Sequence, residues 1–130
     1  MAVQTFEDLK VWQRSCQLAT DVCVWLAPVT FYSLRNQAER SAISVASNIA
    51  EGSERDSPKD FIRFLRIAKG SCSELRTQLY LFKKLSVQLS EPSWEPPEGF
   101  IDETKEINAM LQGLIRSLEA KIQNPRSTEN

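Results

Sequence analysis

Basic side chains recur along one predicted helix, at about residues 58–85. On a helical wheel of about 100° per residue, Phe61 and Leu79 mark the apolar side of this helix. The basic residues opposite that side are Lys59, Arg63 and Arg66, and those on one flank are Lys69, Arg76 and Lys83. Lysine and arginine neutralise phosphates, so this face predicts contact with an anionic polymer such as RNA, without base specificity. The alternative interpretation is a solvated helix face of mixed charge.

Charge is segregated along the sequence. The formal net charge is −1, but residues 33–85 hold ten Lys/Arg against six Asp/Glu, and the remaining residues hold six against eleven. A local surplus of one sign matters more for the choice of partner than the net charge does. The candidate nucleic-acid-binding residues are therefore Arg40, Arg55, Lys59, Arg63, Arg66, Lys69 and Arg76.

The residues that many enzymes and metal sites require are scarce. The 130 residues include no histidine, which removes Ser-His and Cys-His catalysis and histidine metal sites. Cys16, Cys23 and Cys72 form no CxxC pair, and we expect small buried side chains in a reducing cytoplasm rather than reactive or metal-binding thiols. No glycine-rich phosphate loop is present. The sequence therefore predicts a non-enzymatic protein without cofactor or metal.

The composition is that of a soluble globular domain, with 42% apolar and 25% charged residues. No apolar run approaches the roughly 20 residues of a membrane-spanning helix, and the N-terminus lacks a signal-peptide pattern. We therefore expect a cytoplasmic protein that does not contact a membrane.

Apolar residues at helical spacing predict four helices, at about 6–27, 33–54, 58–85 and 100–123. The expected apolar series of the first helix is Leu9, Trp12, Cys16, Ala19, Cys23 and Leu26, with Leu18 and Val22 beside it. That of the third helix is Phe61, Leu65, Ala68, Cys72, Leu75, Leu79 and Phe82. The second helix is expected to bury Leu34, Ala38, Ala42, Val45 and Ile49, with Ile43, Ala46 and Ala50 widening the face. In the fourth helix, Ile107, Leu111, Leu114, Leu118 and Ile122 share a face.

Capping residues support these boundaries. Thr5 with Asp8 resembles a capping box, Ser33 can cap the second helix, and Ser57-Pro58 is a strong start signal. Four amphipathic helices without a strand pattern predict an all-α, antiparallel up-down-up-down four-helix bundle over residues 1–124, followed by a frayed tail at 125–130. Trp94, in the loop before the fourth helix, is expected to fold back onto the bundle.

The motif Asn48-Ile49-Ala50-Glu51-Gly52 ends the second helix. We expect structural roles for its polar members, Asn48 as a hydrogen-bonding residue and Glu51 as an ion-pair partner of Arg55 at i+4. Gly52 lies in the last turn or just past it. Small residues throughout the second helix permit close approach of a neighbouring helix.

Several short sequence motifs and single residues are together specific enough to indicate a family. They are 6–13, Gln37, Arg40, Ala42, 48–52, 61–71 and 74–79. With them, the chain resembles the 23S ribosomal RNA intervening-sequence protein family over roughly residues 5–85. The resemblance implies a small bacterial cytoplasmic four-helix bundle that assembles into a ring-shaped homopentamer. It also implies a similarity to accessory proteins of diversity-generating retroelements, which bind a reverse transcriptase and nucleic acid through a basic surface.

The sequence departs from the family pattern at the second helix, where Glu39 precedes Arg40 in place of two basic residues. Two hypotheses follow. In the first, the protein associates with RNA or DNA through the basic face of the third helix. In the second, it is an oligomeric protein-interaction scaffold with a partner such as a reverse transcriptase.

Overall fold

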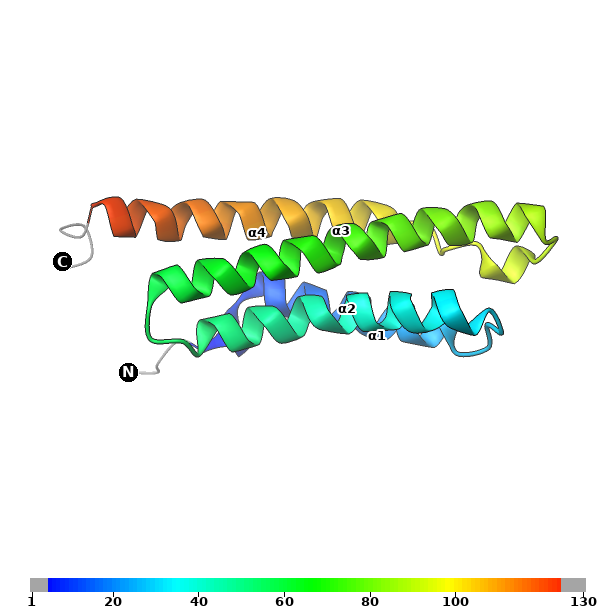
Figure 1. The fold of residues 1–130 in the computed structure, drawn as a ribbon, viewed down its shortest axis with the longest axis horizontal. Coiled ribbons are helices and arrows are strands. Elements are labelled where there is room, and N and C mark those ends of the chain that lie inside the picture. Colours follow the sequence, from blue (N-terminus) through cyan, green and yellow to red (C-terminus); the bar gives the residue numbers. More distant parts are fainter. Residues whose placement is uncertain (1–4, 125–130) are drawn as a thin grey trace.

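The structure, a computed structural model, describes residues 5–124, which form four long α-helices (Figure 1). The helices are α1 (Lys10–Leu26), α2 (Tyr32–Ser53), α3 (Pro58–Gln88) and α4 (Phe100–Gln123), and the 3-10 helices η1 (Phe6–Asp8) and η2 (Pro92–Trp94) precede α1 and α4. No strand occurs within this range, so the all-α four-helix prediction is confirmed. The expected tail at 125–130 lies outside the described residues.

Successive helices run in opposite directions. In Figure 1 the chain reverses at each connection, and α3 lies beside α4 along most of its length. Side-chain contacts fix the α3–α4 pair, because Ser73 contacts Asn108 at 3.2 Å and Arg66 contacts Glu119 at 3.0 Å. The contact that involves the earlier residue of α3 involves the later residue of α4, so the two helices are antiparallel.

The core is formed by one face of each helix. In α3, the whole expected series from Leu65 to Phe82 is buried, and only Phe61 keeps partial exposure. In α2, the five residues of the expected core face, from Leu34 to Ile49, are buried. Ile43, expected to widen that face, is 51% exposed, so this part of the prediction is wrong. α4 buries Ile115, whereas Leu114 and Ile122 are only partly buried, so its inner face is rotated slightly from the prediction.

The buried face of α1 differs from the predicted one. It consists of Val11, Ser15, Leu18, Ala19, Val22 and Leu26. Trp12, Cys16 and Cys23 lie on the flank and keep partial exposure, so the expectation of three buried cysteines holds only for Cys72. Ser15 is admitted to the core because its hydroxyl donates to the Val11 carbonyl at 2.7 Å, which satisfies the buried polar group.

The predicted start of α1 is four residues too early. Residues 6–8 form η1, and Leu9 is extended with φ −76° and ψ 120°, so the α-helix begins at Lys10. The predicted Thr5–Asp8 interaction is present, because the Thr5 amide donates to Asp8 Oδ2 at 3.1 Å, but it caps η1. α1 ends at Leu26, before Pro28.

Of the two predicted serine caps, the one at the start of α3 is present and the one at the start of α2 is not. α2 begins at Tyr32 after Phe31 and has no side-chain cap, so Ser33 does not serve as one. Ser57 does cap α3, with its hydroxyl accepting from the Asp60 amide at 3.1 Å. α3 continues three residues beyond the predicted end, to Gln88, and Ser90 with φ 53° follows it.

The connection between α3 and α4 packs against the bundle. Trp94 is 9% exposed and its ring lies 5.9 Å from that of Phe31, which confirms that it folds back. Trp25 on α1 donates from its indole nitrogen to the Ser93 carbonyl at 3.3 Å. Within residues 5–124, no helix has both the length and the hydropathy that crossing a bilayer requires.

Candidate nucleic-acid interface

Three of the candidate cations lie against α4, and a fourth, Arg76, follows them on the same flank of α3. This set of residues, Lys59, Arg66, Lys69 and Arg76, is here called the α3–α4 seam. Arg66 Nη2 lies 3.0 Å from Glu119 Oε2, and Lys69 Nζ donates to Gln112 Oε1 at 2.6 Å. Arg76 follows Lys69 by seven residues, about 10 Å along the same flank of the helix. The structure therefore places these four cations along one side of α3.

The N-terminal end of this seam is an open pocket of about 320 Å³. Its lining residues come from both helices, namely Lys59, Ile62, Arg66, Glu119, Ile122 and Gln123. Among the described lining residues, Glu119 is the only carboxylate, against two cations. This end of the seam thus keeps a local positive surplus, part of which Glu119 neutralises.

Arg55 and Arg63 form a separate cluster near the turn between α2 and α3. Both guanidinium groups lie over the Phe64 ring, at 4.9 Å and 4.8 Å from its centroid. Arg55 Nη2 also lies 2.7 Å from Glu51 Oε1, which confirms the i+4 pair expected from the sequence, and Arg63 lies 3.7 Å from Asp60. These two arginines are therefore already engaged by a ring and by carboxylates.

Arg40 lies apart from both groups, exposed on α2. Among the described residues it belongs to no ion pair within 4.0 Å. Its neighbour Glu39 pairs with Arg35 at 3.5 Å instead. The seven predicted residues consequently divide into the seam, the Phe64 cluster and a single arginine on another helix.

The Asn48–Gly52 motif holds α2 against α3. Asn48 Nδ2 donates to the Ser44 carbonyl at 2.8 Å and to its hydroxyl at 2.9 Å. The Ser44 hydroxyl in turn lies 2.9 Å from that of Ser71 on α3. Gly52 is buried beside Phe64, where a Cβ would meet the Phe64 side chain. The motif is thus a packing device at this interface.

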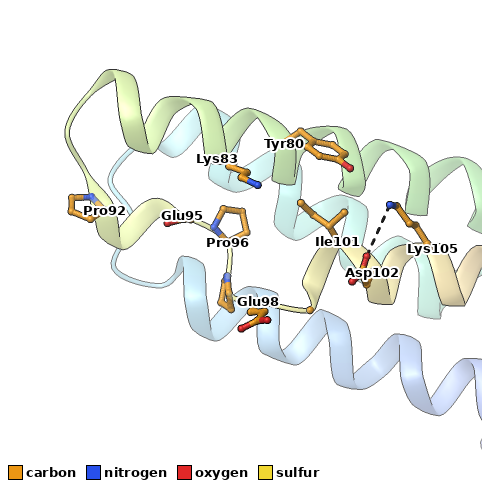
Figure 2. Close-up of a pocket in the computed structure, with 11 residues that line it drawn as sticks. Tyr80, Lys83, Pro92, Glu95, Pro96, Glu98, Ile101, Asp102 and Lys105 are labelled. Carbon is orange, nitrogen blue, oxygen red and sulfur yellow. Dashed lines mark ion pairs between the residues drawn. The ribbon is translucent and has the colours of Figure 1, made fainter.

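The helical spacing of Lys69, Arg76 and Lys83 puts Lys83 on the same flank of α3, beyond the C-terminal end of the seam. There, a pocket of about 620 Å³ brings Tyr80 and Lys83 of α3 near Lys105 of α4 (Figure 2). Lys105 was not predicted, because no local sequence signal relates it to a distant helix. Acidic residues share this pocket, namely Glu95, Glu98 and Asp102, and Asp102 lies 4.0 Å from Lys105.

The thiols show no sign of activation. Burial raises the pKa of Cys72 to about 11, and its Sγ donates to the Thr104 carbonyl at 3.3 Å. Burial also raises the pKa of Cys16 and of Cys23. Over residues 5–124, no group of three or more His, Cys, Asp or Glu side chains is arranged to hold a metal ion.

The fold and the seam define a four-helix bundle with a basic flank on its longest helix. Comparison with protein families gives a match to the 23S rRNA-intervening sequence protein over residues 7–113. This span covers most of the chain, so the protein belongs to that family. The match includes more than half of α4, whereas the motif resemblance ends near residue 85. No curated protein matches the chain.

Proposed function

We propose that this protein is non-enzymatic and associates with RNA along the α3–α4 seam. The observation that carries the proposal is the alignment of Lys59, Arg66, Lys69 and Arg76, of which only Arg66 forms an ion pair among the described residues. Lys69 is bonded to a neutral amide, so its charge remains available. Cations spaced along one flank suit a backbone contact, which fixes position without reading bases.

The pairing of Arg66 with Glu119 does not prevent such a contact. Both side chains are more than 40% exposed, and exposed ion pairs contribute only about 0–1 kcal/mol. A phosphate that replaces Glu119 as the partner also releases condensed counterions, which favours binding at low salt. We therefore propose that Arg66 leaves Glu119 and pairs with a phosphate when RNA binds.

The proposal extends to assembly and location by family resemblance. The protein is proposed to be cytoplasmic and to form a ring-shaped homopentamer. A ring repeats the seam once in each subunit, so the effective local concentration of sites strengthens a weak single contact. Disruption of the ring should then lower the apparent RNA affinity even when the seam is intact.

The test is a matched pair of charge variants. Lys69→Gln/Arg76→Gln removes two seam cations, and Lys10→Gln/Lys121→Gln removes two exposed cations from α1 and α4. Anisotropy of a labelled single-stranded RNA is measured over a series of salt concentrations. The seam variant should lose about tenfold in affinity, and its salt slope should fall by roughly 1.4, about 0.7 per phosphate contact.

Equal losses of RNA affinity in the two variants would show that the seam is an ordinary solvated face.

The second candidate function is a protein-interaction scaffold with a partner such as a reverse transcriptase. The observation that favours it is the exposure of Tyr80, Leu81 and Val87 on α3. A partner that stays bound in nuclease-treated lysate would support this second function, whereas loss of the partner would support RNA.

A further inference from the structure

The C-terminal end of α3 carries an exposed surface that combines apolar and basic side chains. An open groove of about 490 Å³ is lined by Tyr80, Lys83, Lys84, Val87 and Gln88, and is here called the α3 end groove. Val87 is 75% exposed and Tyr80 is 43% exposed. Such grouping of apolar side chains marks an interaction site more often than single exposed residues do.

The charge around this groove has one sign along α3. No Asp or Glu occurs in residues 75–90, whereas Arg76, Lys83 and Lys84 do. Neither Lys83 nor Lys84 forms an ion pair with any residue of the range 5–124. Two unpaired cations therefore flank the apolar side chains of the groove.

We propose that the α3 end groove docks an acidic amphipathic helix of a partner protein. Tyr80 and Val87 are seven residues apart, which is two helical turns or about 10 Å. An incoming helix presents apolar anchors at i, i+3, i+4 and i+7, so two of its anchors can rest against Tyr80 and Val87. Carboxylates beside those anchors then meet the lysines between them, since complementary charges set the register and orientation of a docked partner.

Aliphatic exposure favours a protein over a nucleic acid at this site. Val87 is 75% exposed and gains from burial against apolar side chains. It offers no hydrogen bond to a phosphate or a base edge, and among the described residues Tyr80 is the one aromatic side chain that lines the groove. The inference is therefore separate from the RNA contact, which uses the seam toward the other end of α3.

The neighbouring pocket limits the orientation of the partner. Tyr80 and Lys83 line both hollows, and Figure 2 shows Lys83 between Tyr80 and Pro96. The carboxylates of Glu95, Glu98 and Asp102 also line that pocket. Acidic side chains of the partner are repelled there, so they must lie toward Lys84 and Val87.

A synthetic helix of about 18 residues, with leucines on one face and glutamates elsewhere, serves as the probe. Its control has the same composition with the leucines scattered around the helix. Binding is followed by fluorescence anisotropy, and carbodiimide coupling maps which lysines touch the glutamates. The full-length protein should bind the amphipathic peptide at least tenfold more tightly than the scattered one, with coupling at Lys84.

Val87→Asp and Lys84→Glu should each weaken peptide binding about tenfold. Val24→Asp and Lys10→Glu are the matched controls, because they make the same changes at exposed positions on α1. Circular dichroism establishes that each variant is folded. RNA affinity should not change in Val87→Asp.

Three results would overturn the proposal. The first is equal binding of the two peptides, and the second is equal weakening by the groove variants and their controls. The third is a change of sedimentation coefficient in Val87→Asp, which would show that a second copy of this chain covers the groove.

Discussion

A β-carbon on Gly52 would lie 2.6 Å from the β-carbon of Phe64, closer than real Cβ atoms approach. It would also lie 3.0 Å from Phe61 Cδ1 and 3.3 Å from the Phe61 carbonyl oxygen. The last turn of α2 therefore rests directly on the first turns of α3, with hydrogen as the largest substituent that fits. This contact fixes how the two helices leave the turn between them.

Replacement of Gly52 by alanine should consequently destabilise the protein. Over-packing of a well-packed contact costs about 1–3 kcal/mol, because the Phe64 β-carbon belongs to the backbone-anchored part of its side chain and cannot move alone. Urea denaturation monitored by circular dichroism measures the free energy of unfolding.

Gly70 provides the control for this substitution. It lies inside α3, and a β-carbon added there would have no neighbouring atom within 4 Å, so Gly70→Ala should stabilise the helix by about 0.5–1 kcal/mol. The same sign of effect for both glycines would contradict the close approach at Gly52.

Arg14 and Glu103 join the first and last helices of the bundle. Arg14 Nε donates to Glu103 Oε2 at 2.9 Å, and a second bond joins Nη2 to Oε1, so the pair is bidentate. This bonding raises the pKa of Arg14. A double-mutant cycle with Arg14→Gln and Glu103→Gln should give a coupling free energy of about 1 kcal/mol.

The more exposed pair of Arg55 and Glu51 is the reference for that cycle. Glu51 lies in the last turn of α2 and Arg55 just beyond the helix, at i,i+4 spacing, and the pair should couple by only about 0.3–0.5 kcal/mol. Equal coupling in the two pairs would mean that the bidentate bond adds nothing to the closure of the bundle.

Cys72 should make stability depend on pH in the alkaline range. Its pKa is raised from 9.0 to about 11 because burial disfavours the thiolate. Between these values the unfolded chain has lost a proton that the folded chain keeps, so the free energy of unfolding falls as pH rises. The full loss is about 3 kcal/mol, at about 1.4 kcal/mol per pKa unit.

Comparison with Cys72→Ala isolates this effect from other groups that titrate above pH 9. The variant should unfold with a shallower pH dependence between pH 9 and 11, whatever its stability at pH 7. Parallel profiles for the two proteins would show that Cys72 ionises equally in the folded and unfolded states.

Glu119 should restrain RNA binding, since it holds Arg66 at 3.0 Å. Glu119→Gln should raise the affinity for single-stranded RNA about two- to fivefold at low salt, because it frees Arg66 and removes a like charge facing the phosphates. Filter binding at low and high salt gives the comparison. Glu74→Gln makes the same charge change at an exposed position of α3 and should raise affinity less.

Much of the fold was predictable because hydrophobic periodicity is strongest in the longest helix. The α3 series from Leu65 to Phe82 is the buried face, and Ser57 caps that helix as expected. In α1 two apolar series run side by side, and the alternating spacing of three and four residues favours the one with Trp12 and Cys16. Packing buries the other one, in which Ser15 satisfies its hydroxyl within its own helix.

The candidate site was predictable only as a set of residues on one helix. A helical wheel places Arg63 and Arg66 on the same exposed side of α3, yet Arg63 lies over Phe64 while Arg66 meets Glu119 of α4. The wheel contains no neighbouring helix, so it could not distinguish cations that face a partner carboxylate from those that do not. For the same reason the wheel could not show that Lys105 of α4 and Lys83 of α3 line the same pocket.

The sequence by itself determined the four helices, the buried face of α3 and the family, because helical periodicity and short motifs are local properties of the chain. The tertiary structure decided which cations share a groove, which are already paired, and why Gly52 must be glycine. Those properties depend on the distance between helices far apart in sequence. That distance is set by side-chain packing across the bundle, not by the spacing along any one helix.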